Sequence, residues 1–198
     1  LASSLRRLAR GLPPARWDRT FRDEATRGVG AELEAAARDA RFPLHPARLV
    51  AEVRRAMPDD GVVCLDNGMY KLWFARGYRA RRPSTLLLDN ALATMGAGLP
   101  SAIAAKLVHP ERKVLAVCGD GGFLMSAQEL ATAQQLGLDL VVLVVRDDGY
   151  GMIRWKQGEM GFSDHGMTLH NPDFVRYAEA FGARGVRVTR ADDLASVL

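Results

Sequence analysis

Short apolar runs alternate with segments of helical spacing along most of this chain. Five runs are bounded by turn residues and predict strands: 62–66 (VVCLD), 85–90 (TLLLDN), 114–118 (VLAVC), 140–145 (LVVLVV) and 183–188 (ARGVRV). The run at 140–145 is almost continuously apolar, which is typical of a strand covered on both faces. Because the strands alternate with helices, the pattern predicts a doubly wound α/β fold. Its sheet should be mostly parallel, with helices on both faces.

The helices are predicted from apolar periodicity and from capping residues. Ser126 and Glu129 form the pattern of a capping box at a helix start. Asn171 is expected to cap a later helix, with Pro172 at its first position and Gly182 at its end. The predicted helices span 29–40, 46–57, 69–78, 101–108, 126–137, 171–182 and 191–198.

Residues 1–45 differ from the rest of the chain in composition. They are rich in Arg, Ala and Glu, with expected breaks at Pro13, Pro14, Gly28, Gly30 and Pro43. We interpret them as a linker or helical remnant of a preceding domain, and residues 46–198 as one domain. The sequence does not begin with Met, so we expect a piece of a longer protein.

Composition narrows the function classes. The 198 residues are 48% hydrophobic and 25% charged, as in an ordinary globular protein, and no run of 18 apolar residues predicts a membrane span. The net charge of +4 comes from Arg scattered along the chain, which argues against a nucleic-acid or membrane surface. Cys64 and Cys118 each lie inside an apolar run and are expected to be buried thiols. They favour a reducing, cytoplasmic location.

Two acidic turns follow neighbouring predicted strands: GDGG at 119–122 and RDDG at 146–149. Parallel strands end at one edge of a sheet, so Asp120 and Asp147 should converge. Carboxylates are ligands that Mg²⁺ prefers, and Gly121 and Gly122 would let a phosphate approach the backbone. The alternative for 147–149 is a solvated turn. A dinucleotide fingerprint and a P-loop lysine are both missing from this stretch.

The order and spacing of four motifs resemble the thiamine-diphosphate enzymes. The resemblance is greatest to the diphosphate-binding, C-terminal domain of acetolactate (acetohydroxyacid) synthases, and it covers roughly residues 45–195. The motifs are LATMGAGLPSAIAAK, GDGGFLMSAQELATA, RDDGYGMI and NPDFVRYAEAFGA.

This resemblance implies a metal site. Asp120 matches the first ligand of Mg²⁺, Asp147 the second, and the backbone carbonyl of Gly149 the third. Arg146 departs from the usual Asn at a position that is not a ligand, which puts the local hydrogen bonding in doubt. An Asp in place of the ligand Asn looks like the catabolic branch of these synthases. Asp148 is expected to point to solvent.

The resemblance also implies contacts with thiamine diphosphate. Met95 matches the bulky residue that wedges under the cofactor and bends it, although a Met here could also be core filler. The other expected cofactor contacts are Asn67, Gly68, Tyr70, Gly119, Gly121, Gly122, Tyr150, Gly151, Met152 and Ile153. Asn67-Gly68 is also a common turn dipeptide. Trp155 and Lys156 lie where family members control substrate size, or Trp155 packs on a neighbouring domain.

The implied activity is decarboxylation of a 2-oxo acid such as pyruvate, followed by carboligation that gives 2-acetolactate. An activating glutamate is expected on an N-terminal domain of the other subunit, so we expect no catalytic residue in this chain and no activity from it alone. A homodimer or homotetramer, an optional FAD and a further strand after Leu198 are also implied for the full-length protein. The alternatives are a related 2-oxo-acid decarboxylase or oxidase, a non-catalytic module that keeps the fold, and an unrelated magnesium-phosphate domain.

Overall fold

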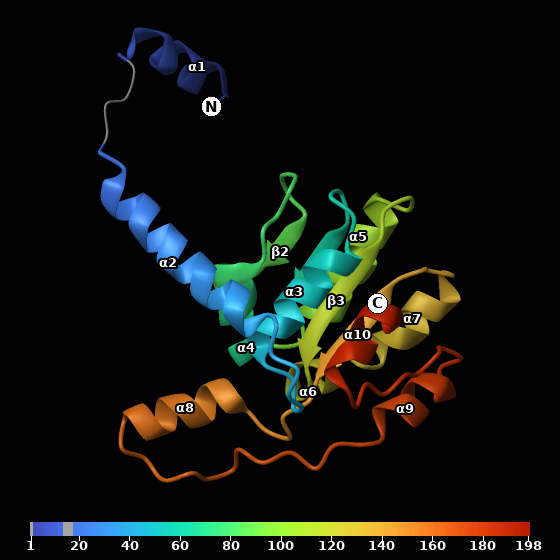
Figure 1. Cartoon of the computed structure of the whole chain (residues 1–198). Coiled ribbons are helices and arrows are strands. Elements are labelled where there is room, and N and C mark those ends of the chain that lie inside the picture. Colours follow the sequence, from blue (N-terminus) through green and yellow to red (C-terminus); the bar gives the residue numbers. More distant parts are fainter. Residues whose placement is uncertain (1, 14–17) are drawn as a thin grey trace.

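A parallel four-stranded sheet organises the protein. The computed structural model describes residues 2–13 and 18–198. Strands β1 (Val62–Leu65), β2 (Leu86–Leu88), β3 (Val114–Gly119) and β4 (Val141–Val145) pair in the order β2-β1-β3-β4 (Figure 1). All three pairings are parallel, which confirms the predicted doubly wound sheet.

Alternate residues of the central strands face two separate cores. Cys64 and Ala116 point to one side, where they pack with apolar residues of several helices. These helices are α5 (Gly98–Val108), α6 (Asp120–Leu124), α7 (Glu129–Gln135) and α9 (Phe174–Ala180). Val63 and Val117 point to the other side. There the covering helices are α3 (Pro46–Ala56), α4 (Met69–Gly77) and α10 (Leu194–Val197).

The far edge of the sheet differs from the prediction. Every residue of β4 is only half-buried, because this strand is at the edge of the sheet and not in its centre. The predicted strand at 183–188 is wrong, since that segment pairs with no strand in the described part of the chain. It packs on α9 instead: a Cβ added to Gly185 would lie 2.6 Å from the carbonyl oxygen of Val175.

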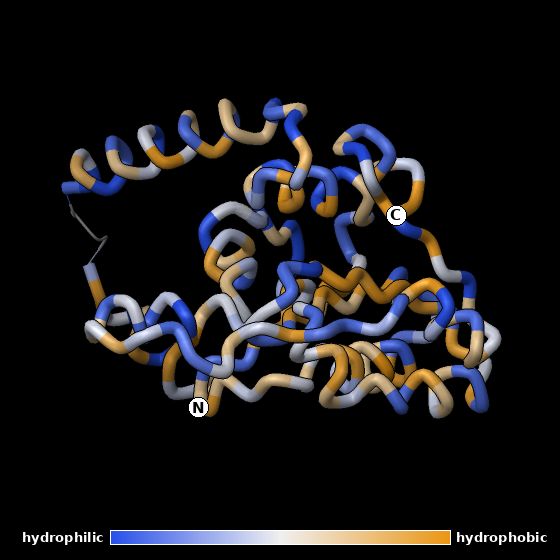
Figure 2. Tube along the Cα trace, turned by 90° about the horizontal axis from the view of Figure 1, so that it is seen from below, coloured by the Kyte–Doolittle hydropathy of each residue, from blue (hydrophilic) through white to orange (hydrophobic). Residues whose placement is uncertain are grey.

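The N-terminal segment forms two exposed helices, α1 (Ala2–Gly11) and α2 (Thr20–Ala36). Figure 1 shows both extending away from the sheet, and in Figure 2 hydrophilic and hydrophobic residues alternate along α2. The predicted breaks at Gly28 and Gly30 are wrong, because α2 runs through both; a helical glycine costs about 1 kcal/mol but does not by itself end a helix. Helix α1 ends before the expected break at Pro13, whereas Pro14 lies outside the described residues. The boundary at residue 45 stays a prediction.

Two predicted helix starts also need correction. Helix α7 begins at Glu129 with Gln128 as its N-cap, and Ser126 makes no cap because residues 125–128 form the turn that leaves α6. The Ser126 hydroxyl is buried and has no hydrogen-bond partner among the described residues. Asn171 is not the cap of α9 either. Asp173 caps it, by accepting hydrogen bonds from two backbone N–H groups of the first turn.

Other predicted ends agree with the structure. Gly182 follows α9 with a φ of +77°, the left-handed conformation that favours glycine at a helix end. Helix α3 begins at Pro46, where the helix over 46–57 was predicted to start, and His45 caps it. No described helix has the length and apolar character that crossing a membrane requires.

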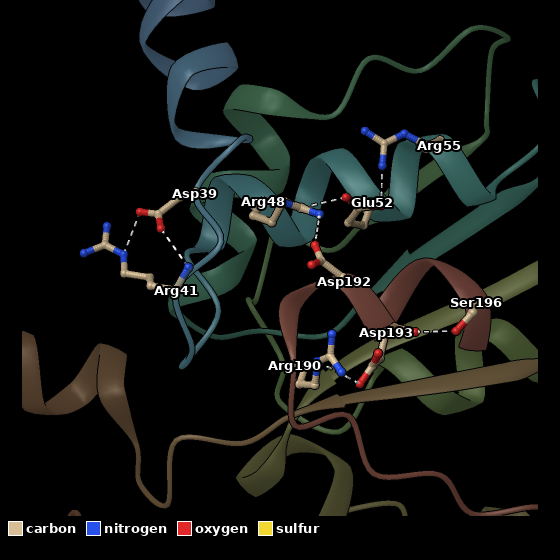
Figure 3. A network of polar contacts seen from close by, with 9 residues as sticks. All are labelled: Asp39, Arg41, Arg48, Glu52, Arg55, Arg190, Asp192, Asp193 and Ser196. Carbon is tan, nitrogen blue, oxygen red and sulfur yellow. Dashed lines mark hydrogen bonds and ion pairs between the residues drawn. The ribbon is translucent and has the colours of Figure 1, made fainter.

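A charge network around the buried Glu52 ties α3 to the C-terminal segment (Figure 3). Glu52 is almost fully buried and accepts from Arg48 at 2.6 Å and from Arg55 at 2.5 Å. Arg48 also reaches Asp192 at 3.1 Å, in the 3₁₀ turn η1 (Ala191–Asp193) that precedes α10. This contact joins η1 to the first turn of α3.

Candidate functional site

The strand order creates a switch point between β1 and β3, where the chain changes its winding direction. From β1 the chain continues to β2 on one side of β1, and then returns to β3 on the other side. Ligands of open α/β sheets bind outside the carboxyl ends of the strands at such a point. In Figure 1 these ends lie beside α6, and Figure 2 views the molecule from that side.

Asp120 and the second acidic turn meet at this edge, as the sequence predicts. Gly119 pairs with Val145 in the sheet, so the residues that follow them leave the sheet side by side. The buried Asp120 carboxylate accepts from the backbone N–H of Asp148 at 2.8 Å through Oδ2. Its Oδ1 accepts from the N–H of Gly121 at 2.9 Å.

The Asp147 carboxyl lies close to Asp120, although the residue as a whole is exposed. Burial of the carboxyl raises its pKa, and the negative charge of Asp120 raises it further; the Gly149 N–H and Arg154 oppose this in part. Gly151 leaves room for the carboxyl, since an added Cβ would lie 2.9 Å from Asp147 Oδ2. Two acidic groups therefore share one small region.

Asp148 holds this turn together. Its backbone adopts a left-handed φ of +54°, and its carboxylate accepts from Arg146 at 2.6 Å and from Asn171 at 2.8 Å. Those two hydrogen bonds, that of Arg146 first, lower the pKa of the Asp148 carboxyl. Asp148 is exposed to solvent, as expected, but its carboxylate also has defined partners, and Arg146 is its ion-pair partner.

Asn67 follows β1 and uses its side chain inside the protein. Its Oδ1 accepts from the buried Lys71 ammonium at 2.6 Å, and its Nδ2 donates to the carbonyl oxygen of Thr94 at 2.8 Å. The carboxamide therefore fixes the loop that leads to Met95.

Tyr70 is buried against the first glycine turn. Its hydroxyl accepts from the N–H of Gly119 at 3.1 Å, which leaves the hydroxyl hydrogen free to donate. The ring lies close to Gly68, where an added Cβ would be 2.6 Å from Cε1. The structure thus brings Gly68, Tyr70 and Gly119 together at the switch point.

Asp66 is a buried residue that the sequence reasoning missed. Its carboxylate accepts from the N–H groups of Gly96 at 2.9 Å, Gly98 at 3.1 Å and Asn67 at 2.6 Å. It thereby fixes the small-residue loop around Met95 to the end of β1. Met95 itself is only partly buried and belongs to neither apolar core, which argues against the core-filler alternative.

The two glycines after Asp120 lie against protein groups. A Cβ on Gly121 would be 2.6 Å from the ring of Tyr150, and one on Gly122 would be 2.9 Å from Oδ1 of Asp66. We expected their open side to face a phosphate, but these groups fill it. A contact between their backbone and a phosphate stays a prediction.

Helix α8 (Gly151–Glu159) leads away from the site and is separated from the sheet in Figure 1. Gly151 and Met152 are half-buried, whereas Ile153, Trp155 and Lys156 are exposed. The Lys156 ammonium lies 4.5 Å from the centre of the Trp155 ring. The substrate-size role of these two residues stays a prediction.

Asn171 is the second missed residue. It donates through Nδ2 to Asp120 Oδ2 at 2.7 Å, as well as to Asp148. The Asn-Pro-Asp sequence predicted a helix cap at this position. The one feature of the sequence that could have indicated a site residue is an uncharged hydrogen-bond donor that follows the two acidic turns.

The donor set suits a divalent cation of hard character. Two carboxylates converge, their mutual repulsion contributes to the raised pKa of Asp147, and a bound cation would relieve it. Among the described residues no group of three or more His, Cys, Asp or Glu is arranged around a common metal position. A site here would thus need an oxygen from the backbone, such as the carbonyl of Gly149, and oxygens of a ligand.

Comparisons with known proteins bear on the same region. Residues 66–198 match the family described as thiamine pyrophosphate enzyme, C-terminal TPP binding domain. Acetolactate synthase of Bacillus subtilis is 43% identical over 154 residues, which are 78% of this chain and 27% of that protein. Catabolic acetolactate synthase of Raoultella terrigena is 36% identical over 181 residues, 91% of this chain and 31% of that protein.

A solved structure is also similar. The thiamine diphosphate-dependent 4-hydroxybenzoylformate decarboxylase of Rhodococcus jostii RHA1 superposes with a TM-score of 0.72 at 28% identity. The superposition covers 77% of this chain and 29% of that one. The chain therefore spans about three-tenths of the length of these relatives.

Proposed function

This chain belongs to the thiamine pyrophosphate enzymes as their C-terminal cofactor-binding domain, and on that premise we propose that it binds the cofactor diphosphate through Mg²⁺ in an acetolactate synthase. The observation that carries the proposal is the hydrogen-bonded convergence of Asp120 with the turn that bears Asp147. In this proposal the two carboxylates and the Gly149 carbonyl hold the cation, and the cation holds the diphosphate.

The chain's own residues have separate tasks. Asp66 fixes the loop that presents Met95, and Asn67 anchors that loop a second time through the carbonyl of Thr94. In this proposal the partly exposed Met95 supports the bent cofactor. When bound, thiamine diphosphate supplies the covalent chemistry on the 2-oxo acid, and the protein supplies binding and orientation.

The proposed reaction is decarboxylation of pyruvate and carboligation to a second pyruvate. It is supported by the similarity to acetolactate synthases, including the catabolic one, and by Asp147 at the position of the second ligand. We further propose a homo-oligomer in which another domain supplies the activating glutamate, and a cytoplasmic location.

A second candidate is a 2-oxo-acid decarboxylase, which would release an aldehyde. The similarity to the 4-hydroxybenzoylformate decarboxylase favours it. The test uses this chain joined to the other domains of its relatives. Its product from pyruvate distinguishes the two candidates. Acetolactate supports the synthase, whereas free aldehyde supports the decarboxylase.

Calorimetry tests the binding proposal on the chain itself. Thiamine diphosphate should bind with Mg²⁺ and bind much more weakly without it. Asp120→Ala should abolish the Mg²⁺-dependent heat. Asp139→Ala is the matched control, because this exposed aspartate precedes β4 and lies at the other end of that strand. Equal binding by the Asp120 variant and the unmodified chain would refute the proposal.

A further inference from the structure

A short segment after α8 returns to the acidic turn and pairs with it. The N–H of Tyr150 donates to the carbonyl oxygen of Met167 at 2.9 Å, and the N–H of Leu169 donates to that of Asp148 at 2.9 Å. Between them, Gly149 and Thr168 form an antiparallel bridge. Residues 167–171 therefore lie fixed against the turn, and they bring Asn171 to the site.

Asn171 joins the two acidic turns through one nitrogen. Its Nδ2 donates to Asp120 Oδ2 at 2.7 Å and to Asp148 Oδ1 at 2.8 Å. Asp120 Oδ2 also accepts from the backbone of Asp148 at 2.8 Å. The three bonds close a small network that links the start of α6 to the turn after β4. The orientation of the carboxamide follows from charge, because its oxygen would be repelled by two carboxylates.

The chemistry of this side chain suits a group behind a cation site. A carboxamide gives two hydrogens without a positive charge, so it can orient carboxylates without competing with a cation. Arg146, by contrast, is charged, and its hydrogen bond in this network goes to Asp148 alone. Groups that hydrogen-bond to metal-ligating carboxylates fix the direction of their oxygens and so determine metal affinity.

We propose that Asn171 is a positioning residue that holds the Asp120 carboxylate in its cation-binding orientation. This inference rests on the proposed function, in which Asp120 is a ligand of Mg²⁺. Asn171 acts through Asp120 and does not itself touch the cation.

The test is Mn²⁺ binding, followed by the electron paramagnetic resonance signal of free Mn²⁺ in the presence of saturating thiamine diphosphate. Asn171→Ala should weaken Mn²⁺ binding about 10-fold or more, the range known for such outer groups. Asn171→Gln keeps the carboxamide and should restore part of the affinity. Gln135→Ala is the matched control, because it removes an exposed carboxamide from the end of α7 that leads to the start of β4, and its Mn²⁺ affinity should equal that of the unmodified chain.

Unfolding by urea without any cation separates positioning from stability. Positioning predicts that Asn171→Ala keeps the midpoint of the unmodified chain. If affinity and midpoint fall together and Gln restores neither, Asn171 is merely structural and the inference is overturned. Unchanged Mn²⁺ binding in Asn171→Ala, with binding lost in Asp120→Ala, overturns this inference alone. Unchanged binding in Asp120→Ala refutes the proposed function instead.

Discussion

Some positions at the switch point require glycine because neighbouring atoms leave no room for a side chain. Gly98 opens α5 at the point where Asp66 and Cys118 come together from β1 and β3. A Cβ there would lie 2.7 Å from Cys118 Sγ and 2.8 Å from Asp66 Cβ, distances at which atoms of the core must move. The small residues of this loop thus permit its close approach to the ends of β1 and β3.

We predict that Gly98→Ala lowers the free energy of unfolding by about 1–3 kcal/mol, the usual cost of overpacking a core. Urea unfolding followed by circular dichroism measures the change. The control is Gly158→Ala in α8, where no atom lies within 4 Å of an added Cβ. It should be neutral or gain up to about 1 kcal/mol. Equal urea midpoints for Gly98→Ala and the unmodified chain would contradict the packing argument.

The two cysteines should be unreactive while the protein is folded. Burial raises the pKa of the Cys64 thiol to about 12, and burial together with the charge of Asp66 raises that of Cys118 as well. Because the thiolate is the reactive form, iodoacetamide at about pH 8 should modify neither in native buffer and both in urea. Intact-mass spectrometry counts the adducts. Rapid modification of the native protein would show that the thiols are accessible.

Among the helices, α3 bears a buried charge that must be neutralised. Glu52 has 1% of its side chain exposed and faces two arginines, of which Arg48 is mostly buried and Arg55 mostly exposed. A buried carboxylate is stable only when it is paired, and its removal leaves the arginines without that partner. The network in Figure 3 is therefore expected to matter for the contact between α3 and η1.

Glu52→Gln should lower the free energy of unfolding by about 1–3 kcal/mol, since buried groups lose charge-assisted hydrogen bonds. Asp192→Asn is the control within the same network, because the Asp192 side chain is 68% exposed and its pairing with Arg48 should contribute under about 1 kcal/mol. Urea denaturation of both variants makes the comparison. A larger loss in the Asp192 variant would show that the surface contact dominates.

At the scale of the whole molecule, the candidate cofactor site is assembled from distant parts of the chain. The turn after β1, the loop around Met95, the start of α6 and the turn after β4 all meet at one edge of the sheet, and residues 167–171 close it. Such a site binds a negatively charged diphosphate only if a cation offsets the acidic groups. Cofactor and cation should therefore stabilise the fold together.

We predict that thiamine diphosphate with Mg²⁺ raises the thermal midpoint of the chain by several degrees, and that EDTA removes the effect. Binding to the folded state alone adds about 2.7 kcal/mol when the ligand is at 100 times its Kd. Differential scanning fluorimetry with each component alone and with both provides the measurement. An equal shift with thiamine diphosphate in EDTA would contradict a cation-mediated site.

Local pattern decided much of the fold. Apolar runs predicted the four strands, and helical spacing predicted α3, because burial of one face depends mainly on nearby residues. The same reasoning placed Asp120 and Asp147 at one edge, since parallel strands share their direction. It failed at Ser126 and at 183–188, where a turn and packing on α9 replaced the local preference.

Only the tertiary structure decided what surrounds the two acidic turns. Asp66 and Asn171 act through hydrogen bonds to residues 30 and 51 positions away, and no local pattern encodes partners at that distance. The same holds for Gly121 and Gly122, whose open side is filled by Tyr150 and Asp66. The sequence by itself determined which residue types could hold a cation. It also determined which strand ends carry those residues. The packing of the chain determined how those residues are oriented, because orientation depends on contacts between distant segments.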